Sequence, residues 1–259
     1  MWIRLRQIAV VTSDLLKTAL DVQTVLGVEA CHIDPGVGAF GLKNTLWPIG
    51  SQFLECVTPV TEDTAGGRYI KRRGGDSGYM VINQVDDVAS RLAHVQELGV
   101  RVANHMEYDK GGFEGLQLHP ADTGGSFFEM DQMKVEGSEV PDGPWWPAGS
   151  QWSDFSRTER VTGISAAELQ AVDPDRLAAR WAQIAQLEVA EDGNGIPAIQ
   201  FENASIRFVE AVDGRGDGLG GIDVVCVDRD AVLAGAQQRN CGVNDELVLL
   251  GGLRVYLRD

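Results

Sequence analysis

The spacing of hydrophobic residues changes along the chain between the period of a strand and the period of a helix. These changes predict the order of strands and helices. Residues 5–12 form an apolar, β-branched run that is typical of a strand. Residues 13–27 then carry apolar side chains at helical spacing, with Ser13 as the expected N-cap and Gly27 as the expected end of the helix. Short strands separated by turn residues are expected next, at residues 39–44, 45–50 and 52–59.

The same order of elements recurs along the rest of the chain. A strand at 78–85 is followed by a helix at 86–99, which Gly99 closes, and by strands at 101–108, 113–120 and 125–132. A weaker repeat predicts strands at 161–172, 198–203, 206–212, 222–227, 246–251 and 253–259, and helices at 173–186 and 228–240. We therefore expect an α+β protein built from four βαβββ modules.

Residues 133–160 interrupt the repeat and predict a boundary between two domains. The segment is rich in Pro, Gly and Ser, which is typical of a linker, and it separates a domain at 1–132 from a domain at 161–259. Because the segment also contains Trp145, Trp146, Trp152 and Phe155, we expect it to pack across a domain surface. An aromatic lid over a ligand is the alternative interpretation.

Charge and composition narrow the choice of partners. The chain of 259 residues has 38 acidic against 22 basic residues, a formal net charge of -16, and this surplus disfavours nucleic acid and anionic membranes. No apolar run is long enough for a membrane helix, and the N-terminus lacks the apolar region of a secretory signal. None of the four cysteines lies in a C-x-x-C motif. A cytoplasmic location with free thiols is therefore expected.

Two glutamates stand on apolar strand faces, where a carboxylate needs a specific reason. Alternation places Phe53, Glu55 and Val57 on one face of their strand, and Phe127 and Glu129 on one face of another. Burial of a carboxylate is costly unless a cation or a hydrogen bond compensates it. A shared cation or a shared proton would satisfy two such groups in one cavity.

Four segments of the sequence together resemble one known family, the vicinal oxygen chelate superfamily. They are "LRQIAVVTSDL", "FLECVTP", "VDDVASRLAHVQELGVRV" and "LHPADTGGSFFEMD". Residues 1–132 resemble its methylmalonyl-CoA epimerase and glyoxalase I branch, whereas residues 161–259 resemble the fold but keep few motifs. The resemblance implies paired βαβββ modules that form two glyoxalase-like domains, with curled mixed sheets around a cavity.

The resemblance also implies a divalent metal held by one residue from each of four strands. Those positions fall at Gln7, Glu55, Met80 and Glu129. The epimerases have histidine at the first and third positions, and one type of glyoxalase I has glutamine at the first. Because a thioether is a poor ligand for hard cations, the expected ligands are Gln7, Glu55 and Glu129, which favour Mg²⁺, Mn²⁺ or Ca²⁺ over Zn²⁺. Alternatively, no metal binds, and hydrogen bonds to Gln7 hold the two carboxyl groups.

Further residues are assigned by position. Phe53, Met80 and Phe127 are expected to line the cavity, and His105 is a candidate acid or base. The single basic run comprises Arg68, Lys71, Arg72 and Arg73. It would suit the phosphates of a CoA thioester, and a solvated helix face is the alternative.

Two functions of different class follow from these residues. The first is an enzyme of the isomerase, epimerase or lyase type, in which a metal assists proton transfer beside a carbonyl group and Glu55, Glu129 or His105 moves the proton. The second is a metal-free protein that binds or sequesters a small molecule, as resistance proteins of this family do. An extradiol dioxygenase is the third hypothesis, although its two iron-binding histidines are replaced here. The expected partners are a small molecule and a second copy of the chain.

Overall fold

The computed structural model describes residues 1–244 and 246–259. Its first half has strand–helix–strand order throughout. The elements are β1 (Ile3–Val11), α1 (Leu15–Leu26), η1 (Pro35–Phe40), β2 (Leu42–Ile49), β3 (Gln52–Pro59), α2 (Ala65–Arg73), β4 (Ser77–Val85), α3 (Val88–Glu97), β5 (Val102–Tyr108), η2 (Asp109–Gly111), β6 (Phe113–Leu118) and β7 (Phe127–Met133). The label η marks a short 3-10 helix.

The second half repeats this order, and its strands range from two residues in β9 to 11 in β8. Its elements are η3 (Trp146–Ala148), η4 (Trp152–Phe155), β8 (Val161–Ala171), α4 (Pro174–Ala185), β9 (Ala190–Glu191), β10 (Pro197–Gln200), β11 (Ser205–Glu210), β12 (Gly218–Cys226), α5 (Arg229–Gln238), β13 (Leu247–Leu250) and β14 (Leu253–Arg258). Among the residues described, no helix has the length and apolar character that crossing a membrane requires.

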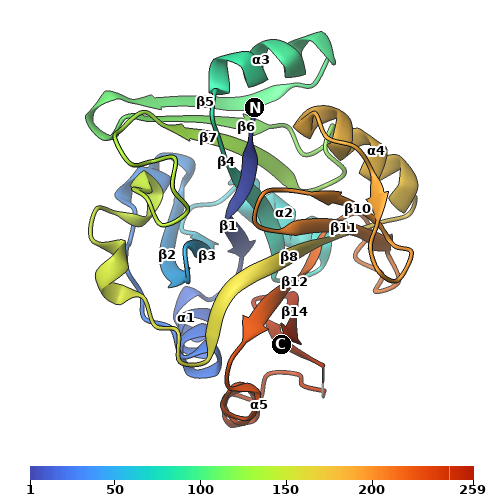
Figure 1. Cartoon of the computed structure of the whole chain (residues 1–259). Helices are drawn as coiled ribbons and strands as arrows, with labels where there is room; N and C mark the ends of the chain where they lie inside the picture. The colour runs from blue at the N-terminus through green and yellow to red at the C-terminus, as the bar shows by residue number, and fades with distance from the viewer. Residues whose placement is uncertain (245) are drawn as a thin grey trace. The chain divides into compact units, whose positions relative to one another are not determined.

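The strands form two seven-stranded mixed sheets, and this confirms the predicted α+β fold (Figure 1). The orders are β2-β3-β1-β4-β7-β6-β5 and β13-β14-β12-β8-β11-β10-β9. Strand β4 pairs with β7 in parallel, as β8 does with β11 and β12 with β14. Hairpin neighbours such as β2 and β3 are antiparallel. Each order has two end strands, so neither sheet is a closed barrel.

Two local predictions differ from the structure in an informative way. The expected strands at 39–44 and 45–50 are one strand, β2, which pairs with β3 along its whole length. The residues before it form η1, capped by the Asp34 side chain. Helix α1 is capped by Asp14 and not by Ser13. The reason is that the Ser13 backbone N–H and hydroxyl both donate to Asp76 Oδ1, at 2.8 and 2.9 Å.

The chain divides into two compact units, each assembled from separated segments. One unit contains Met1–Gln7, Met80–Trp146 and Ala166–Leu219, and the other contains Ile8–Tyr79, Pro147–Ser165 and Gly220–Asp259. Strands β1, β4, β8 and β12 each contribute residues to both units. The sequence-based boundary at 133–160 stays a prediction.

The first unit is built around the indole of Trp181, which is completely buried on α4. The ring packs against Phe128 of β7 and Phe208 of β11, with ring centroids 4.6 and 6.0 Å away. Its Nε1 donates to the Thr123 carbonyl oxygen at 2.9 Å. Helix α4 covers β10 and β11, and α3 covers β6 and β7 (Figure 1). The apolar faces of both helices are thereby removed from water.

The second unit packs α1 and α2 against β3, and α1 also contacts α5. The contact between α1 and α5 is close because Gly235 has no side chain there. A Cβ atom at this position would lie 2.5 Å from the Thr24 carbonyl oxygen. In the same unit the Tyr69 and Tyr79 rings meet edge to face, with centroids 4.9 Å apart.

Candidate functional site

Strand β7 carries three buried side chains on a single face. Successive side chains of a strand point to opposite faces, so Phe127, Glu129 and Asp131 point the same way. All three are buried, with exposed fractions of 9%, 5% and 0%. The parallel register sets Ile82 of β4 beside Glu129, and the antiparallel register sets Gln117 of β6 on its other side. The face therefore carries one phenyl ring and two carboxyl groups.

Asp131 is a part of this site that the sequence analysis missed. Burial, followed by the negative charge of Glu129, raises the pKa of Asp131 well above its usual value. Its carboxyl group occupies space left by Gly115, the residue directly opposite on β6. A Cβ atom on Gly115 would lie 2.8 Å from Asp131 Oδ1. The period of two that linked Phe127 to Glu129 also reaches Asp131, so the signal was present in the sequence.

Gln7 lies on β1, buried to 2% exposure, and belongs to the same unit as Glu129. Its Oε1 atom accepts a hydrogen bond from Trp145 Nε1 at 2.9 Å. The buried Arg6 guanidinium lies over the Trp145 ring, 5.5 Å from the centroid, and donates to the Gly143 carbonyl oxygen at 2.7 Å. Burial, and then the neighbouring Arg4, lowers the pKa of Arg6 to about 9.

Glu55 lies on β3 in the second unit, with an exposed fraction of 6%. Its Oε1 atom accepts a hydrogen bond from Asn44 Nδ2 at 2.6 Å. Phe53, on the same strand face, is fully buried and meets the Trp152 ring edge to face at 5.1 Å. The convergence of Glu55 with Glu129 stays a prediction, as do the cavity-lining roles of Phe53, Met80 and Phe127.

The tryptophans of the 133–160 segment are packing residues in this structure. Trp145 and Trp152 have exposed fractions of 1% and 7%, and each contacts a predicted site residue within its own unit. Trp146 is different because 40% of it is exposed. Trp145 and Trp152 therefore pack within the protein, and the role of the segment as a linker stays a prediction.

His105 lies on the end strand β5 in a cluster of charged groups. Its Nε2 atom is 2.8 Å from Glu114 Oε1 and 3.8 Å from Glu107 Oε1, and the three ligand atoms lie within 4.8 Å of one another. Lys134 Nζ is 2.6 Å from the other oxygen of Glu114. Burial works against ionisation of Glu114, yet hydrogen bonds from Lys134 and His105 lower its pKa. Imidazole and carboxylate ligands at this spacing can hold a divalent metal.

The predicted basic run forms the C-terminal half of α2, and three of its four cations are exposed. Arg73 is the exception, with an exposed fraction of 3%, because its Nε atom donates to Ser77 Oγ at 3.1 Å. The Arg72 guanidinium lies over the Tyr69 ring, 4.8 Å from the centroid. Arg68 donates to the Asp63 carbonyl oxygen. An anion could therefore reach Arg68, Lys71 and Arg72.

Comparison with known proteins identifies the fold. No protein-family model and no curated protein sequence matches the chain. Among solved structures, a triple-substituted 4-hydroxymandelate synthase from Streptomyces coelicolor superposes with a TM-score of 0.67 at 14% identity, over 92% of this chain and 75% of that one. The protein has the vicinal oxygen chelate fold.

Smaller proteins with the vicinal oxygen chelate fold match one half of the chain. A methylmalonyl-CoA epimerase variant from Streptomyces coelicolor, in complex with 2-nitronate-propionyl-CoA, covers 51% of this chain and 98% of its own, at 22% identity and a TM-score of 0.46. The enzyme of that name from Mycobacterium tuberculosis covers 52% of this chain and 91% of its own, at 18% identity and a TM-score of 0.44.

The predicted ligand positions of this vicinal oxygen chelate fold offer oxygen atoms and one sulfur atom. Gln7 and Glu129 are buried and supply an amide and a carboxylate oxygen, whereas Met80 supplies only a thioether. Asp131, two residues beyond Glu129, adds a second carboxyl group. This donor set suits a hard cation such as Mg²⁺, Mn²⁺ or Ca²⁺ better than Zn²⁺.

Proposed function

We propose that the protein is an enzyme that moves a proton at a carbon atom next to a carbonyl group of a small molecule. The class comprises isomerases, epimerases and lyases. One observation carries the proposal: Glu129 and Asp131 bring two carboxyl groups to one buried face of β7. Two ionised carboxylates at such a place repel each other and lose hydration, so a proton or a cation must offset one of the charges.

The two carboxyl groups differ in a way that assigns their roles. Asp131 is completely buried, and its raised pKa favours the neutral acid. Glu129 keeps a small exposed fraction of 5%, so it is the member that can meet a substrate. Glu129 would remove the proton from carbon and return it, while Asp131 keeps the pair at a single negative charge. Groups of the same kind whose environments separate their pKa values are typical of acid–base pairs.

Gln7 and Glu129, which belong to the same unit, would hold a divalent cation until Glu129 leaves it to act as the base. When bound, the cation supplies a Lewis acid that stabilises negative charge on the carbonyl oxygen of the substrate. Trp145 orients Gln7 through the hydrogen bond to Oε1, and Asn44 orients Glu55 in the same manner. Donors that fix ligand side chains commonly support metal sites. A CoA ester is the proposed substrate class.

A specific observation also favours the second candidate, a binding protein without metal. Gln7 Oε1 and Glu55 Oε1 already accept hydrogen bonds from the neutral donors of Trp145 and Asn44. In that case the proton on Asp131 alone would offset the second charge of the carboxyl pair. Dioxygenation is not proposed because Gln7 and Met80 offer no imidazole at the positions where iron would need it.

One experiment separates the two candidates. Metal content is measured on protein purified without a chelator, for the wild type and for Glu129→Gln. The same proteins are incubated in D₂O with a panel of 2-substituted acyl-CoA esters and 2-oxo acids, and NMR follows loss of the proton next to the carbonyl group. We expect deuterium exchange with at least one compound, and a loss of about 10²-fold or more in Glu129→Gln.

Glu97→Gln is the matched control because Glu97 is exposed on α3 and the charge change is the same. It should leave both metal content and exchange unchanged. A divalent ion that is present in the wild type and lost in Glu129→Gln supports the metal-assisted form of the proposal. Absence of exchange with every compound, together with stoichiometric ligand binding that EDTA does not alter, would establish the binding protein instead.

A further inference from the structure

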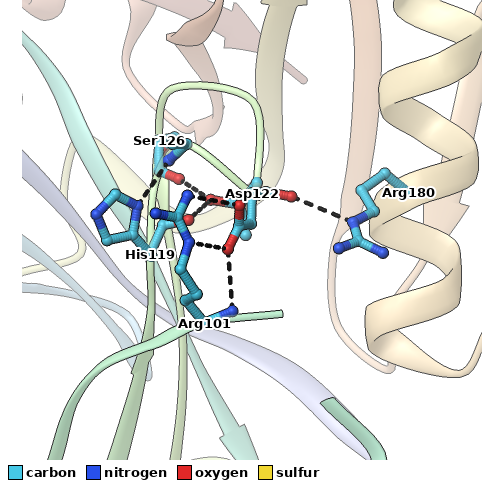
Figure 2. Close-up of polar contacts among 7 residues, drawn as sticks. Arg101, His119, Asp122, Ser126 and Arg180 are labelled. Carbon is cyan, nitrogen blue, oxygen red and sulfur yellow. Dashed lines mark hydrogen bonds and ion pairs between the residues drawn. The ribbon is translucent and has the colours of Figure 1, made fainter. Parts of the chain in front are cut away.

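The first unit contains a hollow of about 730 Å³ between the turn at 119–126 and the first turns of α4. Ala121, Asp122 and Gly124 form one wall, and Arg176, Leu177 and Arg180 of α4 form another. Figure 2 shows Arg180 reaching from α4 toward the turn that carries Asp122. The hollow is separate from the carboxyl pair of β7, because neither Glu129 nor Asp131 lines it.

The walls of the hollow are held in place by hydrogen bonds and close packing. Arg180 Nε donates to the Asp122 carbonyl oxygen at 3.2 Å, and Trp181 Nε1 donates to the Thr123 carbonyl oxygen at 2.9 Å. Gly124 is in the left-handed conformation, with a φ of 71°, and a Cβ atom there would lie 2.3 Å from Leu177. A shape fixed in this way lowers the entropy cost of binding a ligand.

The acidic side chains of the hollow are occupied by other donors. Asp122 accepts two hydrogen bonds from the Arg101 guanidinium, both at 2.8 Å, and one from the Arg101 backbone N–H at 2.9 Å (Figure 2). The Arg101 hydrogen bond lowers the pKa of Asp122, which is therefore ionised and already paired. Asp173 Oδ1 caps α4 by accepting from the Arg176 backbone N–H, and Asp217 Oδ1 accepts from the Val172 backbone N–H.

The two arginines of the hollow contrast with these satisfied acids. Neither Arg176 nor Arg180 forms an ion pair within residues 1–244 and 246–259. Other arginines of this acidic chain, such as Arg207 and Arg239, do have a carboxylate partner. The guanidinium groups of residues 176 and 180 are also separated by one helical turn, where like charges repel each other. Both arginines line the hollow.

We propose that this hollow binds a small phosphate monoester through Arg176 and Arg180. The positive charges of two guanidinium groups attract a phosphate dianion, and its oxygen atoms match their planar donor geometry. The remaining lining includes Val172, Leu177 and Ala121, which offer apolar contact to the organic part of the ester. The hollow is also within the size range of small-molecule sites. The ligand class is therefore an organic phosphate and not inorganic phosphate alone.

Isothermal titration calorimetry of the full chain with phenyl phosphate tests this proposal. The wild type should bind one equivalent, and the double variant Arg176→Gln, Arg180→Gln should bind at least about tenfold more weakly. Inorganic phosphate should bind more weakly than phenyl phosphate, because it lacks the apolar contact. Affinity should also fall with added salt, since the contact is between charges.

The matched control is the double variant Lys43→Gln, Lys110→Gln, which changes net charge by the same amount at exposed cations outside the hollow. It should bind phenyl phosphate as the wild type does. Equal weakening in both double variants would show a general charge effect and overturn the proposal. So would selective loss in the Lys43→Gln, Lys110→Gln variant, or the absence of saturable heat in the wild type at about 10 mM ligand. Circular dichroism of each variant confirms that the loss does not come from unfolding.

Discussion

Gly115 lies directly opposite Asp131 across the β6–β7 pair, and its missing side chain leaves the space that the Asp131 carboxyl group occupies. A Cβ atom on Gly115 would lie 2.8 Å from Asp131 Oδ1 and 2.9 Å from the Phe113 ring. Both neighbours are buried, so neither can move aside without displacing others. The position of the second acid of the proposed site therefore depends on a glycine of the adjacent strand.

Gly115→Ala should destabilise the protein by about 1–3 kcal/mol, because the added methyl group overpacks a filled site. Urea unfolding followed by circular dichroism measures this change. Gly193→Ala is the control, since a Cβ atom at position 193 would meet nothing within 4 Å. It should change the free energy of unfolding by less than about 0.5 kcal/mol. Equal stability of the two variants would contradict the packing of Asp131 against Gly115.

Asp131 should make the folded state less stable as pH rises. Its folded pKa is raised well above the ordinary value of 3.8, so the folded state keeps a proton that the unfolded chain releases. This stability is fully present below pH 3.8 and is lost progressively above it, up to the folded pKa, at no more than about 1.4 kcal/mol per pH unit. Asp131→Asn removes the titrating group. Urea unfolding of both proteins between pH 4.5 and 8 should show the variant gaining on the wild type as pH increases, whereas parallel curves would contradict this.

Trp145→Phe should cost about 1–3 kcal/mol of stability, because it removes the donor that meets Gln7 Oε1 in a buried place. If Gln7 is a metal ligand, the variant should also lower metal content measured by mass spectrometry. Trp146→Phe is the neighbouring control, since 40% of Trp146 is exposed. Its unfolding midpoint in urea should stay close to that of the wild type. A Trp145→Phe protein as stable as this control would show that the hydrogen bond contributes nothing.

Lys134→Gln should increase the affinity of the His105 cluster for Zn²⁺ by roughly tenfold. Glu107 and Glu114 face each other across the β5–β6 pair, and Lys134 Nζ lies 2.6 Å from Glu114 Oε2. The ammonium group therefore competes with any divalent cation for the same carboxylate. Calorimetric titration with Zn²⁺ measures the change in affinity. Adding His105→Gln to the Lys134→Gln protein should abolish the gain in Zn²⁺ affinity. Unaltered Zn²⁺ affinity in Lys134→Gln would argue against a role for these residues in metal binding.

The order of elements could be predicted because each βαβββ module repeats the same succession of strand-like and helix-like hydrophobic spacing. The incorrect predictions at the N-cap of α1 and at residues 39–50 arise from contacts with residues distant in the sequence. Ser13 is a reasonable cap, but contact with the distant Asp76 draws it away and leaves Asp14 to cap α1. The two strands expected at 39–50 merge because pairing with β3 is continuous across the turn residues. Residues distant in the sequence determine the N-cap and the strand bounds, and hydrophobic periodicity carries no information about these partners.

The candidate site was predictable to the extent that it depends on alternation within a strand. Phe127 and Glu129 were placed on one face from the sequence, and the structure buries both. Asp131 lies two residues further along the same strand, so the same alternation places it on this face. The hollow at Arg176 and Arg180 was beyond prediction, since it requires the turn at 119–126 to meet helix α4, which is distant in the sequence.

Strand β5 ends its sheet, and its outer face carries His105 and Glu107 beside the ionised Glu114 of β6. Charged side chains at a sheet margin discourage a strand of another molecule from docking there, because the charges would have to give up water. Self-association by continuing this sheet across two molecules is therefore disfavoured. A homodimer of this chain would have to join through a different surface.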